Sequence, residues 1–192
     1  NWAPDGRTLV FMADFGEGQA IWQVNADGTG MHKVYAPTVD DHTPGKGFNG
    51  LDDGPAFTPD GRRIIFTRCC PQNSGYGLWS VKADGTGLRI VTTEPQGMKG
   101  DGPSDNLPQV SPDGRYVAYS RWDGTFTTIH LVDLRTGSNL ALDPAFGTDE
   151  GYATFSPDST RMLYTDFRSV GNQLVLRRVD GTGAPLDIGP LG

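Results

Sequence analysis

A unit with two turns occurs four times in this chain, and this repeat constrains the fold more than any other feature. Each copy opens with a Pro-Asp turn, whose proline is Pro4, Pro59, Pro112 or Pro157. Roughly twenty residues later, each copy has a second turn rich in Asp, Gly and Thr, at 26–30, 83–87, 133–137 and 179–183. A period of about 45 to 55 residues is typical of supersecondary units that stack on one another. The sequence therefore predicts a repeat architecture.

Short β-type segments lie between these turns, and no segment has a convincing helical pattern. Four segments recur in each copy and are named a to d in chain order. Strand a precedes the first turn, at 55–57, 108–110 and 152–155. Strand b follows that turn, at 8–11, 64–67, 116–119 and 162–165. Strand c precedes the second turn, at 21–24, 78–81, 129–132 and 174–176, and strand d follows it, at 32–35, 88–91 and 140–142. The pattern predicts an all-β fold of four-stranded antiparallel sheets.

The nearly continuous apolar character of strand b indicates a strand that is covered on both faces. Four-stranded antiparallel sheets that are arranged radially, each between two neighbours, are the blades of a β-propeller. We expect one propeller body over residues 1–192. Its blades are expected at about 1–36, 55–93, 108–142 and 152–189.

Residues 55–92 show the repeat most completely: Pro-x-Phe-Thr-Pro-Asp-Gly-Arg, an apolar strand, then Leu-Trp-x-Val-x-Ala-Asp-Gly-Thr-Gly. This pattern resembles the repeat of TolB-type (WD40-like) β-propellers, and the resemblance extends over essentially the whole chain. Such repeats occur in periplasmic TolB proteins, in propeller domains of prolyl-oligopeptidase-like peptidases and in oligogalacturonate-lyase-like enzymes. The resemblance implies six to eight blades, whereas this chain holds four. The chain is then part of a larger propeller, an open arc that a partner completes, or a closed ring of four blades.

Composition excludes some classes of partner. The formal net charge of −7 argues against a nucleic-acid surface, which requires clustered Lys and Arg. No apolar run approaches the roughly 18 residues of a membrane-spanning helix. The chain begins at Asn1 without an initiator Met, and the family resemblance implies a periplasmic or extracellular protein.

Antiparallel strand order places the two recurring turns of every copy at one rim of the propeller. The aspartates of these turns are expected to be structural, because Asp binds turn amides and Gly accepts a positive φ. The long d–a connections, at about 36–54, 93–107 and 143–151, lie at the opposite rim. Binding residues are expected there, since loops on a rigid scaffold commonly carry function.

An acidic residue, followed by an acidic or amide residue, precedes strand a in three copies. The pairs are Asp52-Asp53, Asp105-Asn106 and Asp149-Glu150. As a functional site, they would form an arc of carboxylates at the channel mouth that binds a cation such as calcium, or a basic peptide group. As a structural feature, each Asp would cap amides at the start of the strand and contact the neighbouring blade. Both interpretations can hold together.

Two further features lie on this rim. His42 is in the longest d–a connection, where a histidine near carboxylates could bind a metal or act as a base. Cys69 and Cys70 are adjacent at the end of strand b in the second copy. They either close a vicinal disulfide or remain two reduced thiols.

The sequence favours a non-catalytic role. It contains no Gly-x-Ser-x-Gly motif, no His-Glu-x-x-His motif and no dinucleotide-binding glycine motif. We expect a binding or scaffold module that presents an acidic loop rim to a protein or peptide partner. The alternative is the propeller portion of a larger enzyme, either a prolyl-oligopeptidase-like gate domain or a metal-dependent polysaccharide lyase. A third option is self-association through open edge blades.

Overall fold

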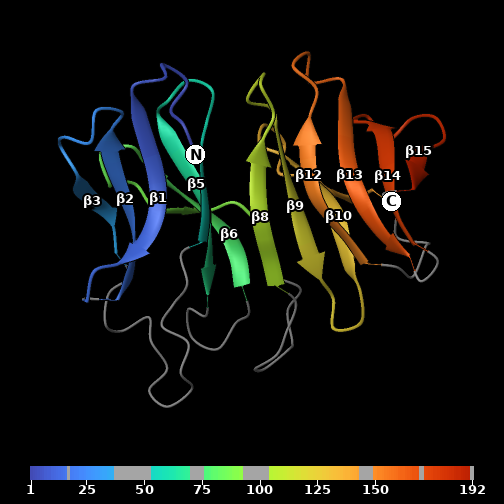
Figure 1. The fold of residues 1–192 in the computed structure, drawn as a ribbon, viewed down its shortest axis with the longest axis horizontal. Coiled ribbons are helices and arrows are strands. Elements are labelled where there is room, and N and C mark those ends of the chain that lie inside the picture. The colour runs from blue at the N-terminus through green and yellow to red at the C-terminus, as the bar shows by residue number, and fades with distance from the viewer. Residues whose placement is uncertain are drawn as a thin grey trace. The chain divides into compact units, whose positions relative to one another are not determined.

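The computed structural model describes residues 1–16, 18–36, 53–69, 76–92, 104–142, 149–168 and 171–190. Over these ranges the regular secondary structure is entirely β (Figure 1). The strands form four antiparallel blades, one for each sequence repeat, which confirms the predicted all-β propeller-blade fold. The chain divides into two compact units, residues 1–108 and 109–192, which are described separately below.

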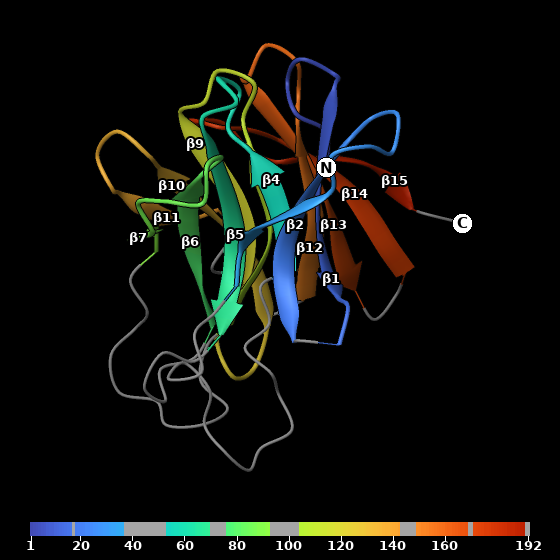
Figure 2. The same cartoon turned by 90° about the vertical axis from the view of Figure 1, so that its left-hand side faces the viewer.

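The first unit contains the first two blades. The first blade consists of β1 (Thr8–Asp14), β2 (Gln19–Asn25) and β3 (His32–Tyr35), and an isolated bridge from Trp2 to Leu9 stands in the position of strand a. The second consists of β4 (Asp53–Phe57), β5 (Arg63–Cys69), β6 (Tyr76–Lys82) and β7 (Arg89–Ile90). Figure 2 shows β4, β5 and β6 as consecutive strands of one sheet.

The core of the first unit lies between its two blades. Val10 and Ile21 come from β1 and β2, while Phe57, Ile64 and Phe66 come from β4 and β5. β5 is buried without alternation from Ile64 to Arg68, as expected for a strand covered on both faces. The blades therefore associate through apolar sheet faces, which is the main source of their stability.

The third and fourth blades supply the second unit. The third consists of β8 (Ser104–Val110), β9 (Tyr116–Trp122), β10 (Thr127–Asp133) and β11 (Asn139–Ala141); β8 crosses the boundary between the units. The fourth consists of β12 (Asp149–Phe155), β13 (Arg161–Arg168), β14 (Gly171–Arg178) and β15 (Leu186–Pro190), side by side in chain order (Figure 1).

The core of the second unit repeats this arrangement. Ala118 and Ile129 from the third blade pack with Met162, Tyr164 and Val175 from the fourth. β12, the first strand of the fourth blade, lies against β9 and β10. β12 therefore sits between its own blade and the preceding one, where its side chains can reach both.

The Pro-Asp turns have the structural role that the sequence predicts. In the second blade, Asp60 accepts hydrogen bonds from the Thr58 hydroxyl at 2.6 Å and from the Arg62 amide at 3.0 Å. Gly61 has a φ of 67°, a conformation that suits glycine. These contacts span only a few residues, so this turn is closed by its own sequence.

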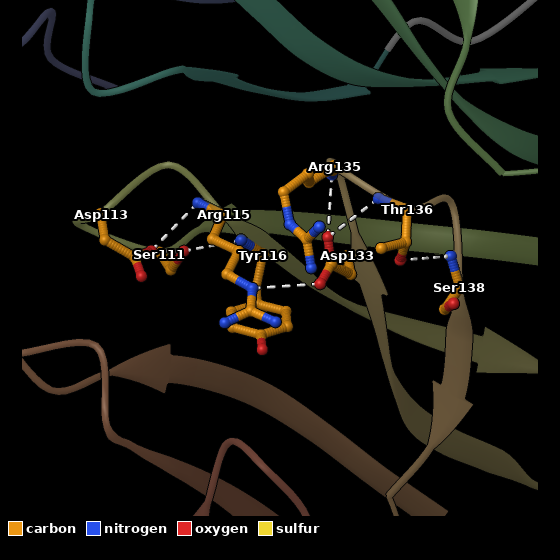
Figure 3. Close-up of polar contacts among 8 residues, drawn as sticks. All are labelled: Ser111, Asp113, Arg115, Tyr116, Asp133, Arg135, Thr136 and Ser138. Carbon is orange, nitrogen blue, oxygen red and sulfur yellow. Dashed lines mark hydrogen bonds and ion pairs between the residues drawn. The ribbon is translucent and has the colours of Figure 1, made fainter.

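Figure 3 shows how the two turns of the third blade are joined. Asp113 accepts from the Arg115 amide at 3.0 Å, and Asp133 accepts from the amides of Arg135 at 2.8 Å and Thr136 at 3.1 Å. Arg115 Nε also donates to Asp133 Oδ2 at 3.0 Å, so its side chain links the first turn to the second. These aspartates are thus engaged in holding the turns.

Candidate functional site at the start of strand a

The structure describes part of the predicted site. The backbone and side chains of Asp105, Asn106, Asp149 and Glu150 are described. Asp53 lies in β4 and Cys69 ends β5, but their side chains are outside the description. His42, Asp52 and Cys70 lie outside the described residues. The redox state of the cysteine pair and the role of His42 therefore remain predictions.

A left-handed residue recurs in strand a of the second, third and fourth blades. Gly54, Leu107 and Tyr152 have φ values of 62°, 55° and 56°. Each of them precedes the proline of its Pro-Asp turn by five residues, so the three positions are equivalent. The strand register breaks at this point, between Asp53 and Ala56 in β4 and between Gly151 and Thr154 in β12. Strand a thus carries a β-bulge at a fixed place in the repeat.

The position of the bulge shows which residues of the acidic pairs are structurally equivalent, and it corrects the equivalence inferred from the sequence. Asp105 lies two residues before Leu107, and Glu150 lies two residues before Tyr152. The structural equivalent of Asp105 is therefore Glu150, whereas the sequence comparison matched Asp105 with Asp149. The same register matches Pro108 with Ala153.

Asp105 is almost completely buried, with 1% of its surface exposed. Its Oδ2 accepts a hydrogen bond of 2.6 Å from the hydroxyl of Thr92, which is buried as well. That hydroxyl in turn accepts a hydrogen bond of 2.9 Å from the backbone amide of Leu78 in β6. Asp105 in β8 is thus connected through Thr92 to strand c of the preceding blade.

Glu150 accepts a hydrogen bond directly from the equivalent amide, with no side chain between them. It is 3% exposed, and its Oε2 accepts a hydrogen bond of 2.7 Å from the amide of Ile129 in β10. Ile129 occupies the same place in strand c as Leu78, because their carbonyl groups accept from Leu142 and Val91 in matching positions. The extra methylene of Glu lets the carboxylate reach the amide that Asp105 reaches through a threonine.

Asp149 differs from these two residues because it is exposed. Its Oδ1 accepts a hydrogen bond of 2.7 Å from the amide of Thr127, at the start of β10. The acids of the fourth blade therefore bind two amides of one strand in the third blade. These contacts match the structural interpretation of the acidic pairs, in which each contacts its neighbouring blade.

Two large side chains project from the bulges. Leu107 is 45% exposed and Tyr152 is 71% exposed, although a left-handed backbone is unfavourable for both residue types. Sequence reasoning missed these residues, because neither Leu nor Tyr signals a left-handed position. The only signal was Gly54, a glycine at the equivalent place in one copy.

Two features, a metal-binding cluster and a membrane-spanning helix, are absent from the residues that the structure describes. Within those ranges, no group of three or more His, Cys, Asp or Glu side chains is arranged to hold a metal ion. The same part of the chain has no helix of the length and apolar character that a membrane crossing requires.

The comparisons with known proteins support the fold. No family model matches the chain. An uncharacterized protein of Agrobacterium fabrum is 25% identical over 179 residues, which cover 86% of this chain and 53% of that protein. The chain therefore spans about half the length of this curated relative.

Three solved structures share the fold. A protein assigned as TolB from Agrobacterium tumefaciens has a TM-score of 0.76 and 16% identity, and the match covers 99% of this chain and 64% of that one. An oligogalacturonate lyase in complex with manganese has a TM-score of 0.68 and 16% identity, covering 98% and 52%. A puromycin hydrolase mutant has a TM-score of 0.71 and 15% identity, covering 98% and 28%. At these identities the likeness establishes a TolB-like propeller fold.

Proposed function

We propose that this chain is the binding module of a TolB-type β-propeller protein and that it holds a protein or peptide partner at the start of strand a. The observation that carries the proposal is a large exposed side chain on left-handed backbone, which occurs once in each unit, as Leu107 and as Tyr152. A non-glycine residue in this conformation costs about 1–3 kcal/mol, and such strain clusters at functional sites. Burial of these side chains within the described fold does not offset that cost.

The remaining features of the rim fit such a partner. Asp149 is exposed beside the bulge of the fourth blade, and the chain as a whole has a net charge of −7. A negative surface favours a partner with basic groups and raises its association rate. The proposal extends to a periplasmic or extracellular location and to a cation such as calcium at the acidic pairs that precede strand a. It also includes completion of the propeller by further blades or by self-association.

The test is a selection from a random peptide library displayed on phage, with the immobilised chain as the target. Enriched peptides are synthesised, and their Kd is measured by calorimetry. We expect the combined variant Leu107→Gly, Tyr152→Gly and Asp149→Asn to bind them at least tenfold more weakly. Asp60→Asn, which lies in a Pro-Asp turn, is the matched control and is expected to bind normally. The proposal is overturned if no peptide is enriched, or if the combined variant binds as well as the unchanged chain.

A second function is favoured by the likeness to the oligogalacturonate lyase, which covers nearly all of this chain. In this case the chain is the propeller portion of a larger enzyme, either a metal-dependent polysaccharide lyase or a prolyl-oligopeptidase-like peptidase. Incubation of the full reading frame with oligogalacturonate and manganese tests the lyase, because its unsaturated products absorb in the ultraviolet. A chromogenic prolyl peptide tests the peptidase. Turnover of either substrate would favour this alternative over the binding module.

A further inference from the structure

Tyr152 in the fourth blade is part of a small aromatic platform. Its ring packs edge-on against that of Phe167, with the ring centroids 6.0 Å apart and the planes at 71°. Phe167 lies on β13 and is itself 36% exposed. A side chain at Gly151 would come within 3.3 Å of the Phe167 ring, so the glycine allows this ring to lie over the strand. The bulge and Gly151 together hold the two rings at the surface.

A fixed carboxylate adjoins this platform. Asp149 is paired with Phe167 in the register of β12 and β13, so the two residues lie directly opposite each other. The hydrogen bond from the Thr127 amide to Asp149 Oδ1 fixes the orientation of this exposed carboxylate. A carboxylate has about four lone-pair sites and can accept further hydrogen bonds beside this one.

We propose that the partner binds through an arginine side chain, which lies on the surface of the fourth blade against Asp149, Tyr152 and Phe167. This inference rests on the proposed function and specifies the chemistry of the partner. The guanidinium group stacks on the ring of Tyr152 and donates hydrogen bonds to Asp149, while the aliphatic stem covers the exposed edge of Phe167. Arginine suits this arrangement better than lysine, since its planar group both stacks and forms paired hydrogen bonds.

The chain already contains internal examples of this geometry. The guanidinium of Arg115 lies 4.7 Å from the ring centre of Tyr116, and that of Arg121 lies 5.3 Å from the ring centre of Tyr119. The first of these guanidinium groups also pairs with a carboxylate, Asp133, at 3.0 Å. A ring and a carboxylate of one blade can therefore engage one guanidinium together.

The probe is the peptide acetyl-Gly-Arg-Gly-amide, and its control is the same peptide with citrulline, which has nearly the same shape and no charge. Binding is followed by NMR as the shift of the Tyr152 and Phe167 ring signals. We expect a saturable shift with arginine and at least fivefold weaker binding of citrulline. Asp149→Asn and Tyr152→Gly should each weaken arginine binding at least fivefold.

Tyr152→Gly keeps the experiment decisive, because glycine already occupies the equivalent position at Gly54. Its thermal unfolding should resemble that of the unchanged chain, so a loss of binding does not reflect a loss of fold. Equal binding of the citrulline peptide, motionless ring signals, or ring shifts with trigalacturonate but not with arginine would each overturn the inference. If library peptides bind while the arginine peptide does not move the rings, the inference alone fails and the proposed function stands.

Discussion

The two ends of the blades use acidic residues in different ways. In the Pro-Asp turns, a carboxylate accepts from groups that are two residues away, as Asp60 does from Thr58 and Arg62. At the start of strand a, a carboxylate accepts from an amide in the preceding blade, as Glu150 does from Ile129, 21 residues earlier. The same chemical group therefore closes a turn at one end and joins two blades at the other.

This difference determines what each acid contributes. The aspartates of the Pro-Asp turns are exposed, so water competes with their hydrogen bonds and each bond adds little. Asp105 and Glu150 are buried, and the amides that they serve have no access to water as a replacement. Loss of a buried acid should therefore weaken the contact between blades, whereas loss of a turn aspartate should weaken only its turn.

The largest expected effect is that of Glu150→Ala. The substitution leaves the Ile129 amide without its carboxylate acceptor and removes buried methylenes, so the free energy of unfolding should fall by about 2–3 kcal/mol. Urea denaturation measures this change. Glu150→Gln is the matched control, because its side-chain oxygen can still accept from Ile129, and it should lose clearly less. Equal stabilities for the two variants would show that the bond between blades contributes little.

The second prediction concerns the threonine that connects Asp105 to Leu78. Thr92→Val keeps the shape of the side chain but removes the hydroxyl that bridges the carboxylate and the amide. We expect the free energy of unfolding to fall by about 2 kcal/mol, since two buried polar groups lose a partner.

Thr92→Ser is the control for this prediction. It retains the hydroxyl and loses only a methyl group, so its loss should be about 1 kcal/mol or less. If Val and Ser have the same effect in urea denaturation, the threonine acts through packing and the hydrogen-bonded connection is not important.

The difference between the two ends also explains what could be predicted from sequence. The Pro-Asp turns were predictable because their contacts lie within a few consecutive residues, all visible in one motif. The aspartates of these turns were correctly interpreted as structural. The four strands of each blade followed from the same turns, since these mark where each strand begins and ends.

The start of strand a was harder to predict, because its contacts reach a different blade. The sequence comparison aligned Asp149 with Asp105, whereas the left-handed positions align Glu150 with it. A left-handed tyrosine has no sequence signature, so the bulge at Tyr152 could not be anticipated. The exposed rings of Tyr152 and Phe167 depend on that bulge and were therefore missed as well.

Ser159 provides a third prediction, on the turn rim. It has a φ of 58° at the position where the other three turns have glycine. Its hydroxyl accepts a hydrogen bond of 3.0 Å from the Asp113 amide in the preceding blade. This turn is therefore hydrogen-bonded to another blade, as strand a is. It is an exception to the rule that the Pro-Asp turns make only local contacts.

Ser159→Ala should lower the free energy of unfolding by about 1 kcal/mol, because the hydrogen bond is lost while the left-handed backbone remains unfavourable. Ser159→Gly loses the same bond but removes that strain, so it should remain closer to the unchanged chain. Thermal unfolding compares the two. Should Gly prove the less stable variant, the strain at Ser159 would be negligible.

The smallest effect is expected from Asp158, whose contacts are all local. The hydroxyl of Ser156 and the amide and hydroxyl of Thr160 donate to its carboxylate and lower its pKa from 3.8 to about 2. Because the pKa is lower in the folded chain, the ionised carboxylate stabilises the fold above about pH 4, and this contribution is lost as the pH falls through 2. Asp158→Asn should therefore lower Tm slightly at pH 7, and the difference should shrink between pH 4 and pH 2. A difference that stays constant over this range would mean that the charge of Asp158 does not stabilise its turn.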